Sequence, residues 1–188
     1  MSVTPLEKEL KIPVENLQLV QKALSARGAI LLTPMAREEN FLLDSEDGRL
    51  GAKGCVLRLR RYGERRVLTF KGPARYEGPI KIRTEQELGI DRLSPMREVF
   101  ELLGFSVVAR YQKDREAWRL DDAEVVLDHT PMGDFVEVEG PIHTLEGVAR
   151  SIGLDPTTAV RGSYMGLWRE YREQRSHEDL PRDMVFKP

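Results

Sequence analysis

Charged residues occupy every second position in many short segments of this chain. Near the N-terminus, Glu7, Glu9 and Lys11 are separated by Lys8 and Leu10. Because side chains two apart on a β-strand lie on the same face, these three charges would point the same way. The same pattern places further charges at Arg58, Arg60, Lys71, Lys81, Arg83, Glu85, Glu87, Lys113, Arg115, Asp128, Glu137 and Glu139. One charged face is ordinary, but repeated faces of both signs predict strands that surround something charged.

The length and composition of the chain indicate one globular domain. Its 188 residues, 40% of them hydrophobic, suffice for one sizeable core and are few for two. We expect the domain to span residues 1–175, followed by a polar, frayed tail at 176–188. The 29 basic and 31 acidic residues give a net charge of −2, which argues against a nucleic-acid partner held by bulk electrostatics.

The cysteine content and the hydropathy pattern bear on the compartment. Cys55 is the only cysteine, which excludes an internal disulfide and a cysteine-rich zinc site and suits a reducing cytoplasm. The N-terminal residues lack a signal-sequence pattern, and no apolar run approaches the roughly 20 residues of a membrane span. We therefore expect a soluble, cytoplasmic protein without a membrane partner.

Hydrophobic periodicity and turn residues divide the chain into strands and helices. Strands are expected at 6–12, 29–44 with an interruption near Pro34, 56–61, 65–71, 80–90, 106–114, 116–120, 124–129 and 134–139. Helices are expected at 14–27, 94–103, 145–152 and 164–173, with Pro13 suited to a first helical turn and Ser94 to a cap. Residues 45–54 and 72–79 are predicted to be loops. A lid role for 72–79 is the less favoured interpretation, since solvent exposure is the default there.

Two architectures could contain strands of this kind. In an open, half-buried sheet, the charged face meets water, and for any single strand this is the commoner arrangement. In a closed barrel with a wet interior, the apolar faces pack outward against helices and the charged faces line a channel. Basic and acidic residues hold matched positions on most strands, while few charges alternate on the other face. This segregation favours the closed α+β architecture with a charged interior.

A tunnel of this composition needs a charged ligand. Several inward bases would be costly if they were left unpaired, and arginine and lysine suit phosphate oxygens. The carboxylates would repel phosphate unless a divalent cation lay between them, and hard oxygen ligands favour Mg²⁺ or Mn²⁺. Bases combined with metal-binding acids are what phosphoryl or nucleotidyl transfer requires. The candidate bases are Lys11, Arg58, Arg60, Lys71, Lys81, Arg83, Lys113 and Arg115.

The segment Glu7-Lys8-Glu9-Leu10-Lys11 resembles the ExExK signature of the CYTH family, the triphosphate tunnel metalloenzymes. Supporting matches, in order, are Leu57-Arg58-Leu59-Arg60, Thr69-Phe70-Lys71-Gly72, Arg83-Thr84-Glu85-Gln86-Glu87, Lys113-Asp114-Arg115, Leu127-Asp128, Phe135-Val136-Glu137-Val138-Glu139 and Ser163-Tyr164. ExExK alone is a weak pattern, whereas the ordered series covers nearly the whole chain. The chain departs from the family at residues 40–44 and at Gly162, which leaves Arg161 as one further phosphate contact to consider.

The resemblance implies an eight-stranded antiparallel tunnel with helices outside. It also implies phosphate binding by the bases named above, and catalytic roles for Glu9, Lys11 and Lys71. The metal ligands that it implies are chiefly Glu7, Glu9, Glu137 and Glu139, with Asp128, Glu85 and Glu87 in support. The oligomeric state cannot be read from the sequence, although the resemblance makes a homodimer unsurprising.

Three functions fit these residues. The first is metal-dependent hydrolysis of a triphosphate, such as tripolyphosphate, ATP or thiamine triphosphate. The second is a class IV-type adenylyl cyclase, which makes cyclic AMP and pyrophosphate from ATP; the spacing around Lys71-Gly72-Pro73 and Lys81-Ile82-Arg83 is similar to that of cyclase-like members. The third is a binder of polyphosphate or nucleotide without catalysis, against which the intact acidic set weighs. The same phosphate clamp serves the first two reactions, so the sequence leaves the choice open.

Overall fold

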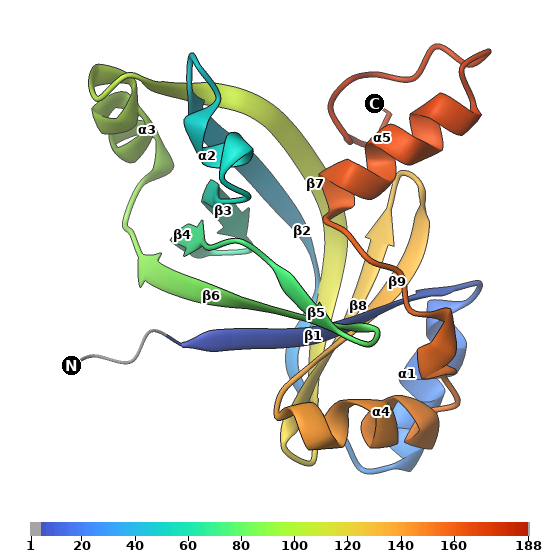
Figure 1. The fold of residues 1–188 in the computed structure, drawn as a ribbon. Helices are drawn as coiled ribbons and strands as arrows, with labels where there is room; N and C mark the ends of the chain where they lie inside the picture. The colour runs from blue at the N-terminus through green and yellow to red at the C-terminus, as the bar shows by residue number, and fades with distance from the viewer. Residues whose placement is uncertain (1–4, 188) are drawn as a thin grey trace.

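A closed antiparallel β-sheet forms the centre of the protein (Figure 1), in a computed structural model that describes residues 5–187. Eight strands form the closed circle, and the hydrogen bonds between β1 and β6 complete it. In spatial order they are β1 (Leu6–Val14), β9 (Gly133–Glu139), β8 (Ala123–Thr130), β7 (Phe105–Leu120), β2 (Ile30–Ser45), β3 (Val56–Tyr62), β4 (Arg65–Lys71) and β6 (Ile80–Gly89). The expected eight-stranded tunnel is therefore confirmed.

β1 extends further than the sequence predicts. It pairs with β6 from Leu6 to Glu9 and with β9 from Glu9 to Val14, so Pro13 lies in the strand rather than in a helical turn. Because the pairing with β6 stops at Glu9, one side of β1 is unpaired at Pro13, where a residue without an N–H is tolerated. The following helix is capped instead by Asn16, whose side chain accepts a hydrogen bond from Leu19 N.

Helices lie outside the circle of strands, as expected. They are α1 (Leu17–Ala26), α2 (Arg49–Ala52), α3 (Leu93–Leu102), α4 (Ile142–Ser151), α5 (Tyr164–Gln174) and the 3₁₀ turn Pro156–Thr158. In Figure 1, α1 and α4 lie close together beside β1, β8 and β9. Their apolar residues pack on the outer faces of these strands in a core that includes Leu10, Leu24, Val138 and Leu145. Leu10 alternates with Glu9 and Lys11, so one strand supplies both the core and the tunnel wall.

The C-terminal segment is packed rather than frayed. Met184 is fully buried in a second core with Tyr111, Phe135 and Trp168. Its backbone N–H donates to Arg110 O, and its carbonyl accepts from Gln112 N. The expectation of a frayed tail is therefore wrong, because Met184, with Leu180 packed against the same core and Phe186 stacked on His129, anchors the segment together with these main-chain bonds. The domain boundary after residue 175 stays a prediction.

Other differences are local. A short helix, α2, occupies the predicted loop 45–54, where the Asp44 carboxylate accepts hydrogen bonds from Leu50 N and Gly51 N. The two strands expected at 106–120 form one continuous strand, β7. α3 begins at Leu93 and has no side-chain cap, so Ser94 lies inside it. Loop 72–79 contains a short ninth strand, β5 (Arg75–Glu77), paired with β6.

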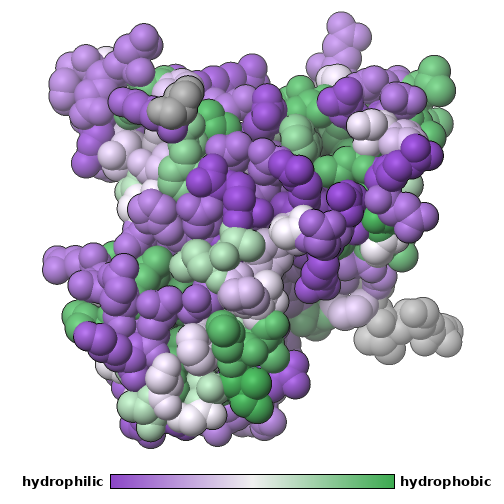
Figure 2. Space-filling model, turned by 180° about the vertical axis from the view of Figure 1, so that it is seen from behind, coloured by the Kyte–Doolittle hydropathy of each residue, from purple (hydrophilic) through white to green (hydrophobic). Residues whose placement is uncertain are grey.

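One face of the molecule is largely polar. Figure 2 shows one face on which hydrophilic residues predominate and hydrophobic residues occur in separate groups. Within residues 5–187, none of the helices combines the length and the apolar character that crossing a lipid bilayer would require.

Candidate functional site

The inward faces of the strands enclose a cavity of about 1110 Å³. Every predicted site residue except Asp128 lines it, namely Glu7, Glu9, Lys11, Arg58, Arg60, Lys71, Lys81, Arg83, Glu85, Glu87, Lys113, Arg115, Glu137 and Glu139. These residues come from strands at both ends of the chain, which the closure of the sheet brings together. Strand alternation therefore identified the wall of one common cavity.

Three carboxylates gather on one side of the cavity. Glu9 and Glu139 are paired across β1 and β9, and Glu7 lies two positions before Glu9 on the same face. Each of the three offers an oxygen, and these oxygens lie within 4.8 Å of one another. We call Glu7, Glu9 and Glu139 the acidic wall.

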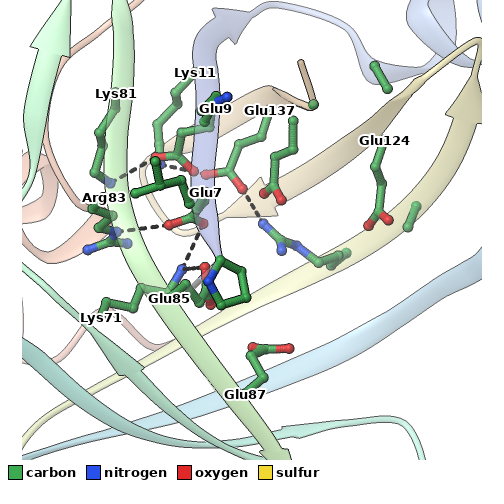
Figure 3. Close-up of a pocket in the computed structure, with 18 of the residues that line it drawn as sticks. Glu7, Glu9, Lys11, Lys71, Lys81, Arg83, Glu85, Glu87, Glu124 and Glu137 are labelled. Atoms are coloured by element: carbon green, nitrogen blue, oxygen red, sulfur yellow. Dashed lines mark hydrogen bonds and ion pairs between the residues drawn. The ribbon is translucent and has the colours of Figure 1, made fainter. Parts of the chain in front are cut away.

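The members of the acidic wall differ in their partners. Glu7 lies 2.8 Å from Lys71 Nζ and 2.9 Å from Arg83 Nε, and Glu9 lies 2.8 Å from Lys81 Nζ (Figure 3). Burial raises the pKa of Glu7, but the charges of Lys71 and Arg83 outweigh burial and hold that pKa well below its ordinary range.

Glu139 has no such partner. Among residues 5–187, no lysine or arginine nitrogen lies within 4.0 Å of its carboxylate. Burial, together with the charges of Glu7, Glu137 and Glu9, raises the pKa of Glu139 to about 8. Closely spaced carboxylate oxygens, one pair of them on a group without a cationic partner, are a donor set that suits a hard divalent cation. The acidic wall could therefore hold a metal ion.

Cations dominate the opposite side of the cavity. Arg58 and Arg60 project from β3, and Lys113 and Arg115 project from β7. We call these four residues the basic wall. Arg58 donates to Tyr111 Oη at 3.1 Å and to Thr69 Oγ1 at 3.2 Å, while Arg60 lies 2.8 Å from Glu87.

Two buried carboxylates hold the β7 cations in place. Asp128 is 0% exposed and accepts hydrogen bonds from Lys113 Nζ at 3.0 Å, from Arg115 at 2.6 Å and from Tyr164 Oη at 2.6 Å. Glu137 pairs with Arg115 and with Lys11. Burial raises the pKa of Glu137, but the charges of Lys11, Lys113 and Arg115 hold it well below its usual range.

The structure separates the predicted metal ligands into two sets. Only Glu7, Glu9 and Glu139 form the close group. The others face cations: Glu137 pairs with Lys11 and Arg115, Asp128 with Lys113 and Arg115, Glu85 with Lys71, and Glu87 with Arg60. A metal-binding role for these four carboxylates stays a prediction.

Sequence reasoning missed a buried acid that lies behind the basic wall. Glu38 is completely buried on the inward face of β2, beside Lys113, Arg60 and Arg115. Burial raises the pKa of Glu38, but the charges of Lys113 and Arg115 hold it well below its usual range. The alternation of Glu38 with Asn40 was a usable signal, but the charged neighbours Arg37 and Glu39 obscured it.

Aromatic side chains were missed as well. Tyr164 lies at the start of α5, with Lys11 Nζ 4.0 Å and Lys113 Nζ 4.6 Å from the centre of its ring. Tyr62 Oη donates to Arg115 O at 2.9 Å. The alternation of charges gives no signal for an aromatic wall residue contributed by a helix.

The segment before α5 contacts loop 72–79. Arg161 donates to Gly78 O at 2.7 Å, and Gly162 N donates to Tyr76 Oη at 3.0 Å. Arg161 does not line the cavity. Its guanidinium group instead contacts loop 72–79. A lid role for the loop stays the less favoured interpretation.

Comparisons with known proteins agree on one family. The CYTH domain family matches residues 5–155. A candidate adenylate cyclase of Methanocaldococcus jannaschii is 24% identical over 173 residues, which cover 86% of this chain and 98% of that protein.

Solved structures share the fold. A candidate adenylate cyclase from Vibrio parahaemolyticus superposes with a TM-score of 0.79 at 19% identity, over 89% of this chain and 99% of that one. A candidate adenylyl cyclase from Hippeastrum, described as revealing a dominant triphosphatase activity, superposes with a TM-score of 0.61 at 17% identity, over 95% and 99% of the two chains. With its ordered tunnel residues and a family match over most of its length, this chain belongs to the CYTH family.

Proposed function

We propose that this protein is a metal-dependent phosphohydrolase that cleaves a triphosphate bound inside the tunnel. One observation carries the proposal: three close carboxylates, of which Glu139 has no cationic partner in the described chain, and a basic wall face the same cavity. Phosphoryl transfer needs cations that hold phosphate oxygens and a second group of charges that stabilises the reacting end. CYTH membership and the triphosphatase activity described for the Hippeastrum protein support the same reaction class.

In this proposal the basic wall holds the phosphate chain. The guanidinium groups of Arg58, Arg60 and Arg115 present forked donors that match phosphate oxygens, and Lys113 adds a compact charge. These cations are already paired with carboxylates, so the phosphate must compete with Glu87, Asp128 and Glu137 for them. A chain of several phosphates gains enough contacts at once to do so.

The acidic wall would hold Mg²⁺ or Mn²⁺ through Glu7, Glu9 and Glu139. When bound, such an ion supplies positive charge that lets phosphate oxygens approach these carboxylates. Lys71 and Lys81 lie beside the acidic wall, paired with Glu7 and Glu9. They limit the repulsion between this wall and the phosphate chain.

The catalytic roles that we propose follow from this placement. Water attacks the terminal phosphorus in line, the bond to the bridging oxygen breaks, and the shortened phosphate leaves. A carboxylate of the acidic wall, Glu9 in our assignment, orients the reacting end and accepts the proton of water. The ammonium groups of Lys11 and Lys71 neutralise the charge that develops on the phosphate oxygens.

Adenylyl cyclase is the second candidate, favoured by the names of the relatives in Methanocaldococcus and Vibrio. In that reaction the ribose 3′-hydroxyl attacks the α-phosphorus. Of the described residues that line the cavity, the aromatic ones are Tyr62, Tyr111 and Tyr164, and each is at most 7% exposed. Their hydroxyl groups are hydrogen-bonded to the wall, so no open ring is offered to an adenine. This favours the hydrolase.

Incubation of the purified protein with tripolyphosphate, thiamine triphosphate or ATP, each with Mg²⁺ or Mn²⁺, separates the candidates. Release of orthophosphate is the expected result, and cyclic AMP from ATP would assign the cyclase instead. Tripolyphosphate binding without turnover with either metal would leave the third candidate, a protein that binds polyphosphate without catalysis. A cytoplasmic location, a homodimer and the lack of a nucleic-acid partner stay predictions.

A further inference from the structure

A buried carboxylate lies behind the basic wall. Glu38 is 0% exposed on the inward face of β2, and it does not line the cavity. Its carboxylate lies 3.5 Å from Lys113 Nζ, 3.6 Å from Arg60 and 3.8 Å from Arg115. One acid therefore faces three of the cations to which we assign phosphate binding, from the side away from the ligand.

The hydrogen bonding of Glu38 is incomplete. Its Oε1 accepts a hydrogen bond from Asn40 Nδ2 at 2.9 Å, whereas its Oε2 is buried without a hydrogen-bond partner among the described residues. A buried carboxylate oxygen without a hydrogen-bond donor destabilises the folded state, and an apolar side chain at such a buried position is often more stabilising. A carboxylate at this position, despite its cost, points to a role in placing the neighbouring charges.

Glu38 also joins two strands electrostatically. Each of its three cations has a second acidic partner on a different strand: Arg60 lies 2.8 Å from Glu87 on β6, and Lys113 and Arg115 lie 3.0 and 2.6 Å from Asp128 on β8. These second partners draw the β3 cation and the β7 cations in different directions. Glu38, on β2 between β3 and β7, draws all three toward one point.

We infer that Glu38 is a positioning residue that sets the spacing of Arg60, Lys113 and Arg115 for the phosphate chain without touching it. The inference rests on the proposed function. Loss of the Glu38 charge would have two opposed effects. The wall would gain positive charge, so its affinity for a polyanion would not fall. The three cations would relax toward Glu87 and Asp128, so the bound chain would be misplaced and its cleavage slowed.

The test compares three variants. Glu38→Gln keeps the size of the side chain and an acceptor for Asn40 but removes the charge, and Glu38→Asp restores the charge. Glu39→Gln is the matched control, because Glu39 is the next residue of β2 and pairs with Arg61 and Gln112 outside the cavity. The measurements are kcat and KM for tripolyphosphate with Mn²⁺, and the affinity and stoichiometry of metal-free tripolyphosphate binding by calorimetry.

Glu38→Gln is expected to lower kcat by about tenfold or more, with full stoichiometry and a metal-free affinity at least equal to that of the wild type. Glu38→Asp is expected to recover much of kcat, and Glu39→Gln to match the wild type. A smaller fall in kcat, a fall matched by lost stoichiometry, or no recovery in Glu38→Asp would overturn the inference. If the wild type releases no orthophosphate, the proposed function is wrong, whatever the role of Glu38. The inference about Glu38 is then tested by metal-free tripolyphosphate binding alone, and weaker binding by Glu38→Gln than by the wild type overturns it.

Discussion

The acidic wall and the basic wall balance their charges differently. On the acidic wall, Glu7, Glu9 and Glu139 place carboxylate oxygens within 4.8 Å of one another, and Glu139 has no cationic partner in the described chain. On the basic wall every cation already faces a carboxylate or a hydroxyl group of the protein. Every cation of the basic wall is therefore compensated within the protein, whereas on the acidic wall Glu7 and Glu9 are paired with cations and Glu139 alone is left to an added cation.

This difference separates binding from chemistry. Changes on the acidic wall should mainly affect metal-dependent turnover, because the polyphosphate is held elsewhere. Changes on the basic wall should affect phosphate binding and also stability, because its cations are partners of buried acids. Variants on the two walls should therefore differ in whether they lose turnover alone or binding and stability as well.

The largest effect is expected for Glu9→Gln on the acidic wall. The variant loses one charge of the metal-binding group and the carboxylate that we assign to the reacting end. Turnover of tripolyphosphate should fall by about a thousandfold or more, while metal-free tripolyphosphate binding stays within a few-fold of the wild type. Glu146→Gln, on the exposed face of α4, is the control. Turnover equal to that of the wild type would remove Glu9 from the mechanism.

Arg115→Ala tests the basic wall. The substitution leaves Asp128 and Glu137 short of a partner in a buried setting, so the free energy of unfolding in urea should fall by about 3–5 kcal/mol. Tripolyphosphate binding should weaken in the same variant. Arg37→Ala provides the contrast, because its pair with Asp114 lies at the surface and should contribute little. Similar losses of stability in both variants would contradict the assignment of a tightly coupled interior.

Tyr164→Phe removes one hydrogen bond from the basic wall and keeps the ring that faces Lys11 and Lys113. Because the lost bond ends on the buried carboxylate of Asp128, the free energy of unfolding should fall by about 1.5–3 kcal/mol. Tyr171→Phe, on the same helix, is expected to leave stability unchanged. Equal thermal midpoints for all three proteins would show that the Tyr164 hydroxyl group is not needed there.

The smallest effect concerns pH. Because the pKa of Glu139 is about 8 in the metal-free protein, this carboxyl group is protonated at neutral pH and a metal ion must displace that proton. Mn²⁺ affinity, measured by calorimetry, should therefore rise between pH 6 and pH 8, by at most about tenfold per pH unit. Glu139→Gln should bind more weakly and show a shallower pH dependence. A Mn²⁺ affinity that does not change with pH would show that metal binding does not displace a proton from Glu139.

The free energy of unfolding of the metal-free protein should also depend on pH through Glu139. A carboxyl group whose pKa is higher in the folded than in the unfolded state stabilises the fold while it is protonated in both states. That contribution is lost as the pH rises from about 4.5 through about 8. Urea unfolding of the wild type and of Glu139→Gln across this range should differ most at its alkaline end.

Much of the tunnel could be predicted because alternation along a strand decides which face each side chain takes. It placed Arg58, Lys81 and Glu137 correctly in one cavity. It could not say which charges lie opposite one another, because Glu9 meets Glu139 only through the closure of β1 on β9. Charged neighbours obscured Glu38. Tyr164 was named only in the Ser163-Tyr164 match, without a role, because alternation along strands gives no signal for a wall residue that comes from a helix.

Two further errors have tertiary causes. Pro13 suits a helical turn by its backbone preference, yet pairing with β9 holds it in a strand. The C-terminal segment is held by Met184, Leu180 and Phe186, whose packing partners include residues far away in the chain. Local preference was outweighed in both places by packing.

The closure of the sheet also constrains how the molecule is made. β1 leaves the ribosome before β9, because Glu137, the partner of Lys11, follows 126 positions later. Until β9 has been synthesised, most of β1 lacks its neighbouring strand. Its charged face then has no tunnel to line, and its apolar face has no complete core to pack into. Pairing across so long a separation slows folding, so the ring of strands can close only late, after most of the chain is available.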